Sequence, residues 1–232
     1  MTNVAIIRKT SVADSPRLVK EALSLAKNYS VLILAWDRKG TDRIHASEIP
    51  RYVQIKHLKL RAPSGNLLLF LYFPFFWIWS FANLLIFKPK VVHACDLDAV
   101  IPSYVYKLVA PRAKIVFDVW DNYALYGEFQ TRSILRHLVA SLEDFFALKA
   151  DAFILPTRTR LKVFNRARLR PVTIIMNCPN DIGLHTPKNS NKFRMVYAGK
   201  IRDGRGLLRI ANAIKNFSDI ELRNPSLSDQ IS

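Results

Sequence analysis

The segment from Lys90 to Tyr123 constrains the fold most, because it predicts a strand, a helix and a second strand in direct succession. Short apolar runs begin at Val91 and at Ile115. The residues between these runs carry apolar side chains at helical spacing. Two apolar strands joined by one helix are typical of neighbouring parallel strands that are covered on both faces.

Polar side chains follow both predicted strands. His93, Asp96 and Asp98 come at the end of the first strand, and Asp118 and Asp121 come at the end of the second. In open parallel sheets, ligands bind just beyond the carboxyl ends of the strands. The sequence therefore predicts a binding or catalytic site at this edge of the sheet.

The start of the chain predicts the same architecture. An apolar strand from Val4 to Ile7 precedes a helix from Pro16 to about Lys27, and a second strand covers Val31 to Trp36. This β–α–β unit is typical of a doubly wound sheet. Polar and apolar residues alternate from Tyr52 to Leu60, which predicts a half-exposed edge strand.

Further strands are predicted at residues 151–156 and 172–176, so the fold class is α/β with a doubly wound parallel sheet. Residues 1–176 form the predicted Rossmann-like N-terminal domain. Residues 177–192 are polar and contain Gly, Pro and Asn, which is typical of a linker. Residues 193–232 predict one more β–α unit, and we expect an incomplete second α/β lobe.

Five segments outside the phosphate loop resemble family 4 glycosyltransferases, which have the two-domain GT-B fold. They are SPRLVKEALSLAKN, VLILAWDRKG, VVHACDLDA, IVFDVWDNY and SLEDFFALKADAFILPT. The chain departs from the family at Cys95 and Trp120, where many members have histidine. The resemblance implies that the first domain holds the acceptor and the second holds the nucleotide-sugar. It implies catalytic roles for His93, Asp96, Asp118 and Asp121, and acceptor-side positions for Ser11, Ser15, Arg17 and Trp120.

The segment from Gly199 to Gly206 is the predicted phosphate loop, with three basic residues between a strand and a helix. Glycines allow the backbone to approach a ligand closely, and the amide groups at a helix start favour an anion. The loop also resembles the one that contacts the donor diphosphate in the same family. The candidate donor-phosphate residues are Gly199, Lys200, Arg205 and Gly206.

The resemblance implies a retaining transferase that moves a sugar from a nucleotide-sugar to an acceptor, in cell-envelope polysaccharide, glycolipid or glycoprotein synthesis. No metal or other cofactor is expected. Family members carry a second pair of acids that grips the donor, which the 232 residues lack. We therefore expect a truncated chain that is inactive alone. The alternative is a non-enzymatic membrane-surface or partner-binding module derived from such an enzyme.

The segment from Leu67 to Phe87 contains no charged residue. As one helix it would be about 31 Å long, close to the thickness of a bilayer core. It could span a membrane, be a buried crossover of the sheet, or pack on the domain with one side while its aromatic residues enter a membrane surface. We favour the third interpretation over burial, because a helix buried on one sheet face should still show polar residues on its outer side. We favour both over spanning, because spanning would separate the first three strands from the fourth.

The chain has 35 basic and 18 acidic residues, a net charge of +17 that predicts attraction to polyanions. From Arg158 to Arg170 there are six basic residues and no acidic one, and helical spacing would group Arg158, Lys162 and Arg166. Such a cluster suits an anionic membrane. Nucleic-acid binding is not expected, because only Phe164 could stack on bases. The predicted location is the cytoplasm, at the inner face of the membrane, with an anionic or lipid-linked acceptor.

Several single residues have ordinary structural interpretations. The helical pattern alone makes Arg17 a solvated helix residue, and it places Glu143 and Asp144 on a solvated helix face. Cys95 and Cys178 have neither disulfide-scaffold nor metal-site spacing, which predicts two buried thiols in a reducing compartment.

Overall fold

The computed structural model describes residues 2–40, 50, 52–63, 67–125, 133–164, 172–178, 193–197 and 206–223. The chain divides into two compact units, Met1–Cys178 and Pro179–Ser232. Each unit is described by itself below.

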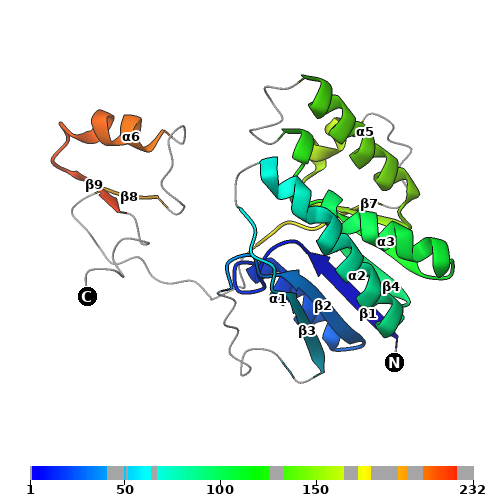
Figure 1. Ribbon diagram of the computed structural model, residues 1–232. Coiled ribbons are helices and arrows are strands. Elements are labelled where there is room, and N and C mark those ends of the chain that lie inside the picture. Colours follow the sequence, from blue (N-terminus) through cyan, green and yellow to red (C-terminus); the bar gives the residue numbers. More distant parts are fainter. Residues whose placement is uncertain are drawn as a thin grey trace. The chain divides into compact units, whose positions relative to one another are not determined.

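The first unit is built on a seven-stranded sheet in which every neighbouring pair of strands is parallel (Figure 1). The strand order is β3-β2-β1-β4-β5-β6-β7, which confirms the predicted doubly wound fold. The strands are β1 (Asn3–Arg8), β2 (Ser30–Trp36), β3 (Val53–Leu58), β4 (Val91–Cys95), β5 (Lys114–Asp118), β6 (Ala152–Leu155) and β7 (Val172–Ile174).

The strand order reverses between β1 and β4. From β1 the chain adds β2 and β3 on one side, and it then returns to place β4 on the other side of β1. The predicted strand–helix–strand unit is confirmed as β4, helix α3 (Leu97–Val109) and β5, with Cys95 opposite Asp118. The point of reversal is where open α/β sheets bind ligands.

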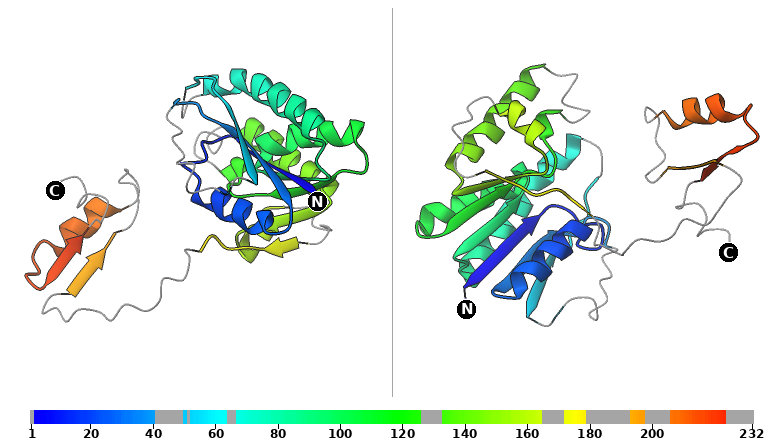
Figure 2. Two further views of the ribbon diagram at one scale, coloured as in Figure 1. Left: turned by 90° about the horizontal axis from the view of Figure 1, so that it is seen from below. Right: turned by 180° about the vertical axis from the view of Figure 1, so that it is seen from behind.

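Helices cover both faces of the sheet, as apolar parallel strands require. Helix α1 (Pro16–Ala26) packs on one face, and helices α2 (Phe73–Phe87), α3 and α5 (Ser133–Lys149) lie along the other (Figure 2). Alternate residues of one strand enter opposite cores, because side chains in a strand alternate between its faces. In β2, for example, Ile33 contacts the α1 side and Leu34 the α2 side.

The uncharged segment 67–87 forms a 3₁₀ helix, Leu67–Tyr72, followed by α2. Pro74 lies in the first turn of α2 and not near the middle of one long helix, because proline is tolerated where the helix begins. The stretch Leu68–Phe87 is long and apolar enough to cross a membrane, with a mean hydropathy of 1.7. Only 22% of that window is buried, although one side of α2 packs on the sheet. The pairing of β1 with β4 argues against spanning.

The basic segment after β6 differs from the prediction. Residues Arg158–Val163 form a 3₁₀ helix, and the residues from 165 to 170 lie outside the described part of the chain. A 3₁₀ helix has three residues per turn, so Arg158 and Lys162 do not lie above one another as in an α-helix. Thr157 is the N-cap residue of this helix, but its side chain makes no capping hydrogen bond.

The described part of the second unit is a single β–α–β arrangement. Strands β8 (Phe193–Val196) and β9 (Ile220–Arg223) are parallel, and helix α6 (Leu207–Ile214) lies between them in sequence. This arrangement contains the β–α unit that the sequence predicts for residues 193–232, with one further strand. Gly206 is the N-cap residue that precedes α6, and its φ of 74° is a left-handed conformation that favours glycine.

Candidate functional site

The candidate site lies at the carboxyl ends of β1, β4 and β5, beside the point where the strand order reverses. Strand alternation places His93, Cys95 and Asp118 on the face of the sheet that α1 covers. Helix α1 adds Arg17 and Glu21, which are one helical turn apart. The sheet and the helix thus bring five chemically active side chains together.

Asp118 is the centre of a buried network. Arg17 Nη2 donates to both oxygens of its carboxylate, at 2.8 and 2.7 Å, and Trp120 Nε1 donates to Oδ2 at 2.8 Å. His93 Nε2 lies 3.1 Å from the same Oδ2. Arg17 Nε also donates to Glu21 Oε1 at 2.7 Å. We call these five residues the Asp118 network.

The network sets the protonation of its members. Burial acts to raise the pKa of Asp118, but His93, Arg17 and Trp120 hold this pKa below its ordinary value. Burial acts to lower the pKa of His93, but the hydrogen bond and charge of Asp118 raise it overall. Burial raises the pKa of Glu21, whose Oε2 lies 3.8 Å from His93 Nε2. The site therefore combines an ionised Asp118 with two groups, His93 and Glu21, whose pKa values both lie above their ordinary values.

Asp96 orders the loop that follows β5. Its Oδ1 accepts backbone N–H groups of Trp120 and Asp121 at 2.8 and 3.0 Å, and its Oδ2 pairs with Arg8 at the end of β1. The guanidinium carbon of Arg8 lies 4.0 Å from the ring centroid of Trp120, and that of Arg17 lies 4.7 Å from it. Trp120 therefore joins the Asp96 and Asp118 contacts through two cation–π interactions.

These distances show which predicted catalytic residues lie together. His93 and Asp118 are in direct contact, whereas Asp96 contacts Arg8 and the loop backbone. Asp121 is half-buried and contributes its backbone N–H to this loop. Only His93 and Asp118 are thus arranged to share a proton.

A cavity of about 460 Å³ opens beside the Asp118 network. Arg17, Glu21 and His93 line it together with Lys20 and the segment Ile175–Cys178. Lys20 Nζ donates to the carbonyl oxygen of Cys178 at 2.8 Å, which ties this segment to α1. The cavity gives ligands access to the otherwise buried His93.

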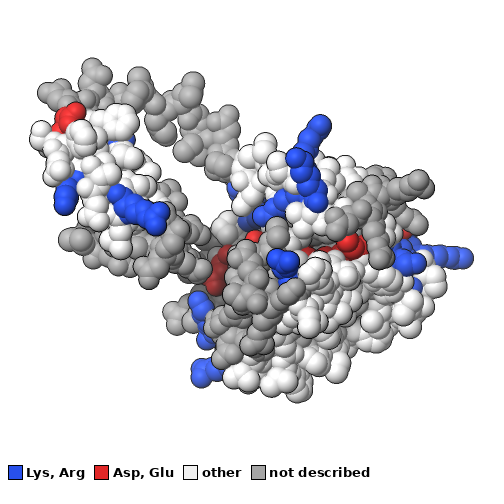
Figure 3. Space-filling view, turned by 90° about the horizontal axis from the view of Figure 1, so that it is seen from above, with Lys and Arg blue, Asp and Glu red and all other residues white. Residues whose placement is uncertain are grey.

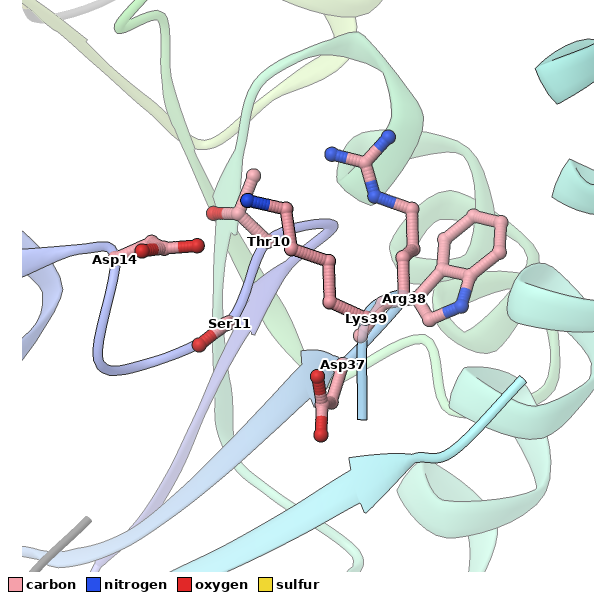
Figure 4. A pocket seen from close by; sticks show the side chains of 7 residues that line it. Thr10, Ser11, Asp14, Asp37, Arg38 and Lys39 are labelled. Atoms are coloured by element: carbon pink, nitrogen blue, oxygen red, sulfur yellow. The ribbon is translucent and has the colours of Figure 1, made fainter. Parts of the chain in front are cut away.

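The two predicted acceptor-side serines have different environments. Ser11 lines a small cavity of about 30 Å³ between the loops that follow β1 and β2, with Asp37 and Lys39 opposite it (Figure 4). Ser15 is buried, and its Oγ lies 2.9 Å from Thr10 Oγ1. A cavity of this size holds about a water molecule and not a sugar.

The interpretation of Arg17 and Glu143 as solvated residues is wrong. Both are buried, and Tyr123 donates its backbone N–H to Glu143 Oε1 at 2.8 Å. The sequence contained one indication of a partner for Arg17, namely its four-residue spacing from Glu21. Seen from above the view of Figure 1, basic side chains project from the surface of the first unit, and its visible acidic atoms lie in a recess (Figure 3).

A third polar group was also missed by sequence reasoning. Tyr123 OH donates to Asp98 Oδ1 and accepts from Lys9 Nζ, and the ammonium nitrogen lies 3.9 Å from the ring centroid of Tyr123. Burial and the charge of Asp98 raise the pKa of Tyr123 well above its ordinary value. This hydroxyl therefore stays protonated and links β1 to α3.

Three predicted donor-phosphate residues lie outside the described part of the chain, namely Gly199, Lys200 and Arg205. Gly206 is described, and it precedes α6 as predicted. The role of this loop remains a prediction.

Four side chains on the α1 face offer donor atoms within 4.8 Å of one another, namely Glu21, His93, Cys95 and Asp118. Zinc takes imidazole, thiolate and carboxylate ligands. In the structure, however, Arg17, Trp120 and His93 already contact the carboxylate of Asp118. We therefore describe this cluster as an ion-pair network and assign no metal to it.

Cys95 is buried as predicted, whereas Cys178 is exposed, which corrects the prediction of two buried thiols. Burial, with the charges of Glu21 and Asp118, raises the pKa of Cys95 well above its ordinary value. We expect iodoacetamide to alkylate Cys178 at least about tenfold faster than Cys95 in the native chain, because the thiolate is the reactive form. Peptide mass spectrometry would measure both rates. Similar rates in native buffer, and not only in urea, would contradict this environment for Cys95.

No protein-family model and no curated protein matches the sequence. Solved structures do match. They include the sucrose-phosphate synthase of Thermosynechococcus elongatus (TM-score 0.67, 14% identity, 97% of this chain and 62% of that chain). The Anabaena protein HepE, in complex with UDP and glucose, has a TM-score of 0.61 and 12% identity over 97% of this chain and 60% of that one. The lipopolysaccharide outer core galactosyltransferase WaaB has a TM-score of 0.60 and 9% identity over 99% of this chain and 70% of that one.

The chain therefore spans 62% of the length of the sucrose-phosphate synthase that it matches. At these identities the similarity concerns the fold. The chain has the Rossmann-like α/β fold of the GT-B glycosyltransferase structures, with a seven-stranded parallel sheet and a separate two-stranded parallel sheet.

Proposed function

We propose that this chain takes part in transferring a sugar from a nucleotide-sugar donor to an acceptor. The observation that carries the proposal is the conjunction of the GT-B fold with the Asp118 network at the point of strand reversal. A GT-B structure of similar fold holds UDP and glucose, which supports a nucleotide-sugar as donor. The fold alone supports several chemistries, so the site is the part of the argument specific to this chain.

In this proposal, each part of the site has a role. His93 faces the 460 Å³ cavity and contacts Asp118, so it can hydrogen-bond an acceptor hydroxyl and exchange a proton with it. Asp96 and Trp120 position the loop, with Asp121 at its edge. Arg17 lines the same cavity on the acceptor side, whereas the cavity at Ser11 is too small for a sugar and Ser15 is buried. Lys200 and Arg205 would stabilise the departing diphosphate with retention of configuration, without a metal.

The acceptor in this proposal is anionic or lipid-linked, and the chain works at the inner face of the cell membrane. A solved structure with a similar fold is a lipopolysaccharide galactosyltransferase, which supports an acceptor of this kind. Membrane contact would involve the segment Leu67–Phe87, with the basic segment Arg158–Arg170 as a second element.

Ligand binding tests the proposal directly. We expect the purified chain to bind a nucleotide-sugar, seen as saturation transfer to the ligand in NMR. Lys200→Ala or Arg205→Ala should weaken this binding about ten- to a hundredfold, because a charge-assisted hydrogen bond contributes about 1.5–3 kcal/mol. Lys215→Ala, which removes an exposed charge at the end of α6, serves as the matched control.

Two outcomes would contradict the proposal. One is that no member of a panel of UDP-, GDP- and dTDP-sugars binds. The other is that the two loop variants and the control behave alike. Absence of nucleotide-sugar binding would favour the second candidate, a non-enzymatic membrane-surface or partner-binding module, for which the exposed apolar side of α2 is the supporting observation.

A further inference from the structure

Three helices form one apolar layer on the outside of the first unit. Helices α2, α3 and α5 lie side by side on the sheet face opposite α1 (Figure 1, Figure 2). Each exposes large apolar side chains on the side away from the sheet. Exposed examples are Phe75, Ile78 and Ile86 on α2, Leu108 on α3, and Leu138 and Phe145 on α5. We call this surface the apolar face.

The composition of α2 makes this exposure unusual. A helix that packs on a sheet normally carries polar residues on its outer side, and one that is apolar all round is normally buried. The helix α2 contains no charged residue, yet Ile78 is 67% exposed and Ile86 is 73% exposed. Contiguous apolar surface of this kind marks a site of contact with a membrane or a protein.

Basic residues border the apolar face where α2 and α3 end. Lys88 and Lys90 follow α2, and Arg112 and Lys114 follow α3; all four are exposed. Lys90, Arg112 and Lys114 also line an open hollow of about 710 Å³. Each basic residue close to an anionic bilayer strengthens binding by about fivefold. An apolar layer with a basic border is the pattern of proteins that lie on anionic membranes.

We propose that the apolar face docks on an anionic lipid bilayer, with α2, α3 and α5 in the interface and none of them crossing the membrane. The occupant is a bilayer because the outer side of α2 offers apolar groups and no charged partner, while the adjoining border and the net charge of +17 complement anionic headgroups. The proposal extends the contact beyond the single segment 67–87 to three helices. It rests on the membrane contact in the proposed function and deepens it, whereas bilayer binding itself does not depend on sugar transfer.

Vesicle sedimentation of the full chain tests this proposal. We expect the chain to sediment with vesicles of phosphatidylcholine and phosphatidylglycerol, and less with phosphatidylcholine alone. Ile78→Glu in α2 and Leu138→Glu in α5 should each lower the partition coefficient by about tenfold or more, because each places a charge where an apolar group would be buried. Asn28→Glu is the matched control, since Asn28 is exposed at the end of α1, on the opposite face of the sheet.

A charge reversal tests the basic border separately. Lys90→Glu with Arg112→Glu should weaken binding to the anionic vesicles about tenfold or more and leave binding to phosphatidylcholine unchanged. Circular dichroism and thermal unfolding would verify that every variant is folded, which is expected because the substituted residues are exposed.

Several results would overturn the proposal. They are absence of binding by the wild-type chain, equal losses in the Asn28→Glu control, and an effect of Ile78→Glu without an effect of Leu138→Glu. A stable dimer that needs Ile78 and is unaffected by vesicles would show that a second copy covers the face. Nucleotide-sugar binding is measured without lipid, so its failure would leave this result untouched.

Discussion

Replacing Asp118 with alanine is expected to lower the free energy of unfolding by about 3–5 kcal/mol, the usual cost of removing one partner from a buried ion pair. Asp118 is fully buried and contacts Arg17, Trp120 and His93. Alanine would leave the buried guanidinium of Arg17 with Glu21 as its remaining carboxylate partner. Urea unfolding at pH 7, followed by tryptophan fluorescence, would measure the loss.

Asp121→Ala is the matched control for this substitution. It removes the same carboxylate three residues further on, at a half-buried position whose backbone N–H bond to Asp96 alanine retains. We expect it to change stability by less than about 1 kcal/mol. Equal losses in the two variants would show that Asp118 has no special place in the network.

The contribution of Asp118 also has a defined pH range. Its folded pKa lies below its ordinary value of 3.8, so the ionised form is stabilised by folding. The contribution of Asp118 to the free energy of unfolding is therefore present above the pKa of the unfolded chain. It is lost as the pH falls through the pKa of the folded chain. For this reason the comparison of Asp118→Ala with Asp121→Ala belongs at neutral pH.

Replacing Glu143 with glutamine is expected to raise stability by about 3 kcal/mol at pH 8 and to change it little at pH 4.5. Burial raises the pKa of Glu143 from 4.5 to about 7, although backbone N–H groups of Tyr123 and Ala124 oppose this. As the pH rises, Glu143 therefore loses its proton at a lower pH in the unfolded chain than in the folded chain. Stability falls between about pH 4.5 and 7, and it stays lower above that range.

Glutamine cannot ionise, so the variant should lack this part of the pH dependence. Its amide oxygen can still accept the N–H of Tyr123, which keeps the loop attached to α5. Urea unfolding at a series of pH values from about 4 to about 9, which brackets the transition, would measure the difference in stability between the two chains. Parallel stability curves for the parent and Glu143→Gln would show that folding does not raise the pKa of Glu143, contrary to the prediction.

His93 adds a second loss of stability with rising pH, and this loss occurs at higher pH than that of Glu143. Its folded pKa is raised, so its contribution is complete below the unfolded pKa and is lost as the pH rises through the folded pKa. The parent chain therefore contains both effects, and only the difference between parent and Glu143→Gln isolates Glu143.

The sheet was predictable because strand periodicity is a local property. Apolar runs at β1, β2, β4 and β5 are short, and each is followed by a helix or a turn, which predicts parallel neighbours. The position of His93 and Asp118 near the carboxyl ends followed from the same pattern. Even the half-exposed edge strand β3 was visible in the alternation of residues 52–60.

The contacts within the site were not predictable. Arg17 and Asp118 are 101 residues apart, and they meet because α1 packs on the face toward which Asp118 points. The face of a side chain depends on the exact start of a strand, and a shift by one residue reverses it. The helical pattern therefore assigned Arg17 to solvent, although its charge has a buried partner.

The amino-acid sequence by itself determined the parallel α/β sheet and the edge at which its polar side chains gather, because both depend on neighbours along the chain. Only the tertiary structure decided that Arg17 and Glu143 are buried, and that α2, α3 and α5 share an exposed apolar face. Burial depends on what packs against a residue from distant parts of the chain. A charged or apolar side chain therefore has the same local pattern whether it faces solvent, a buried partner or a membrane.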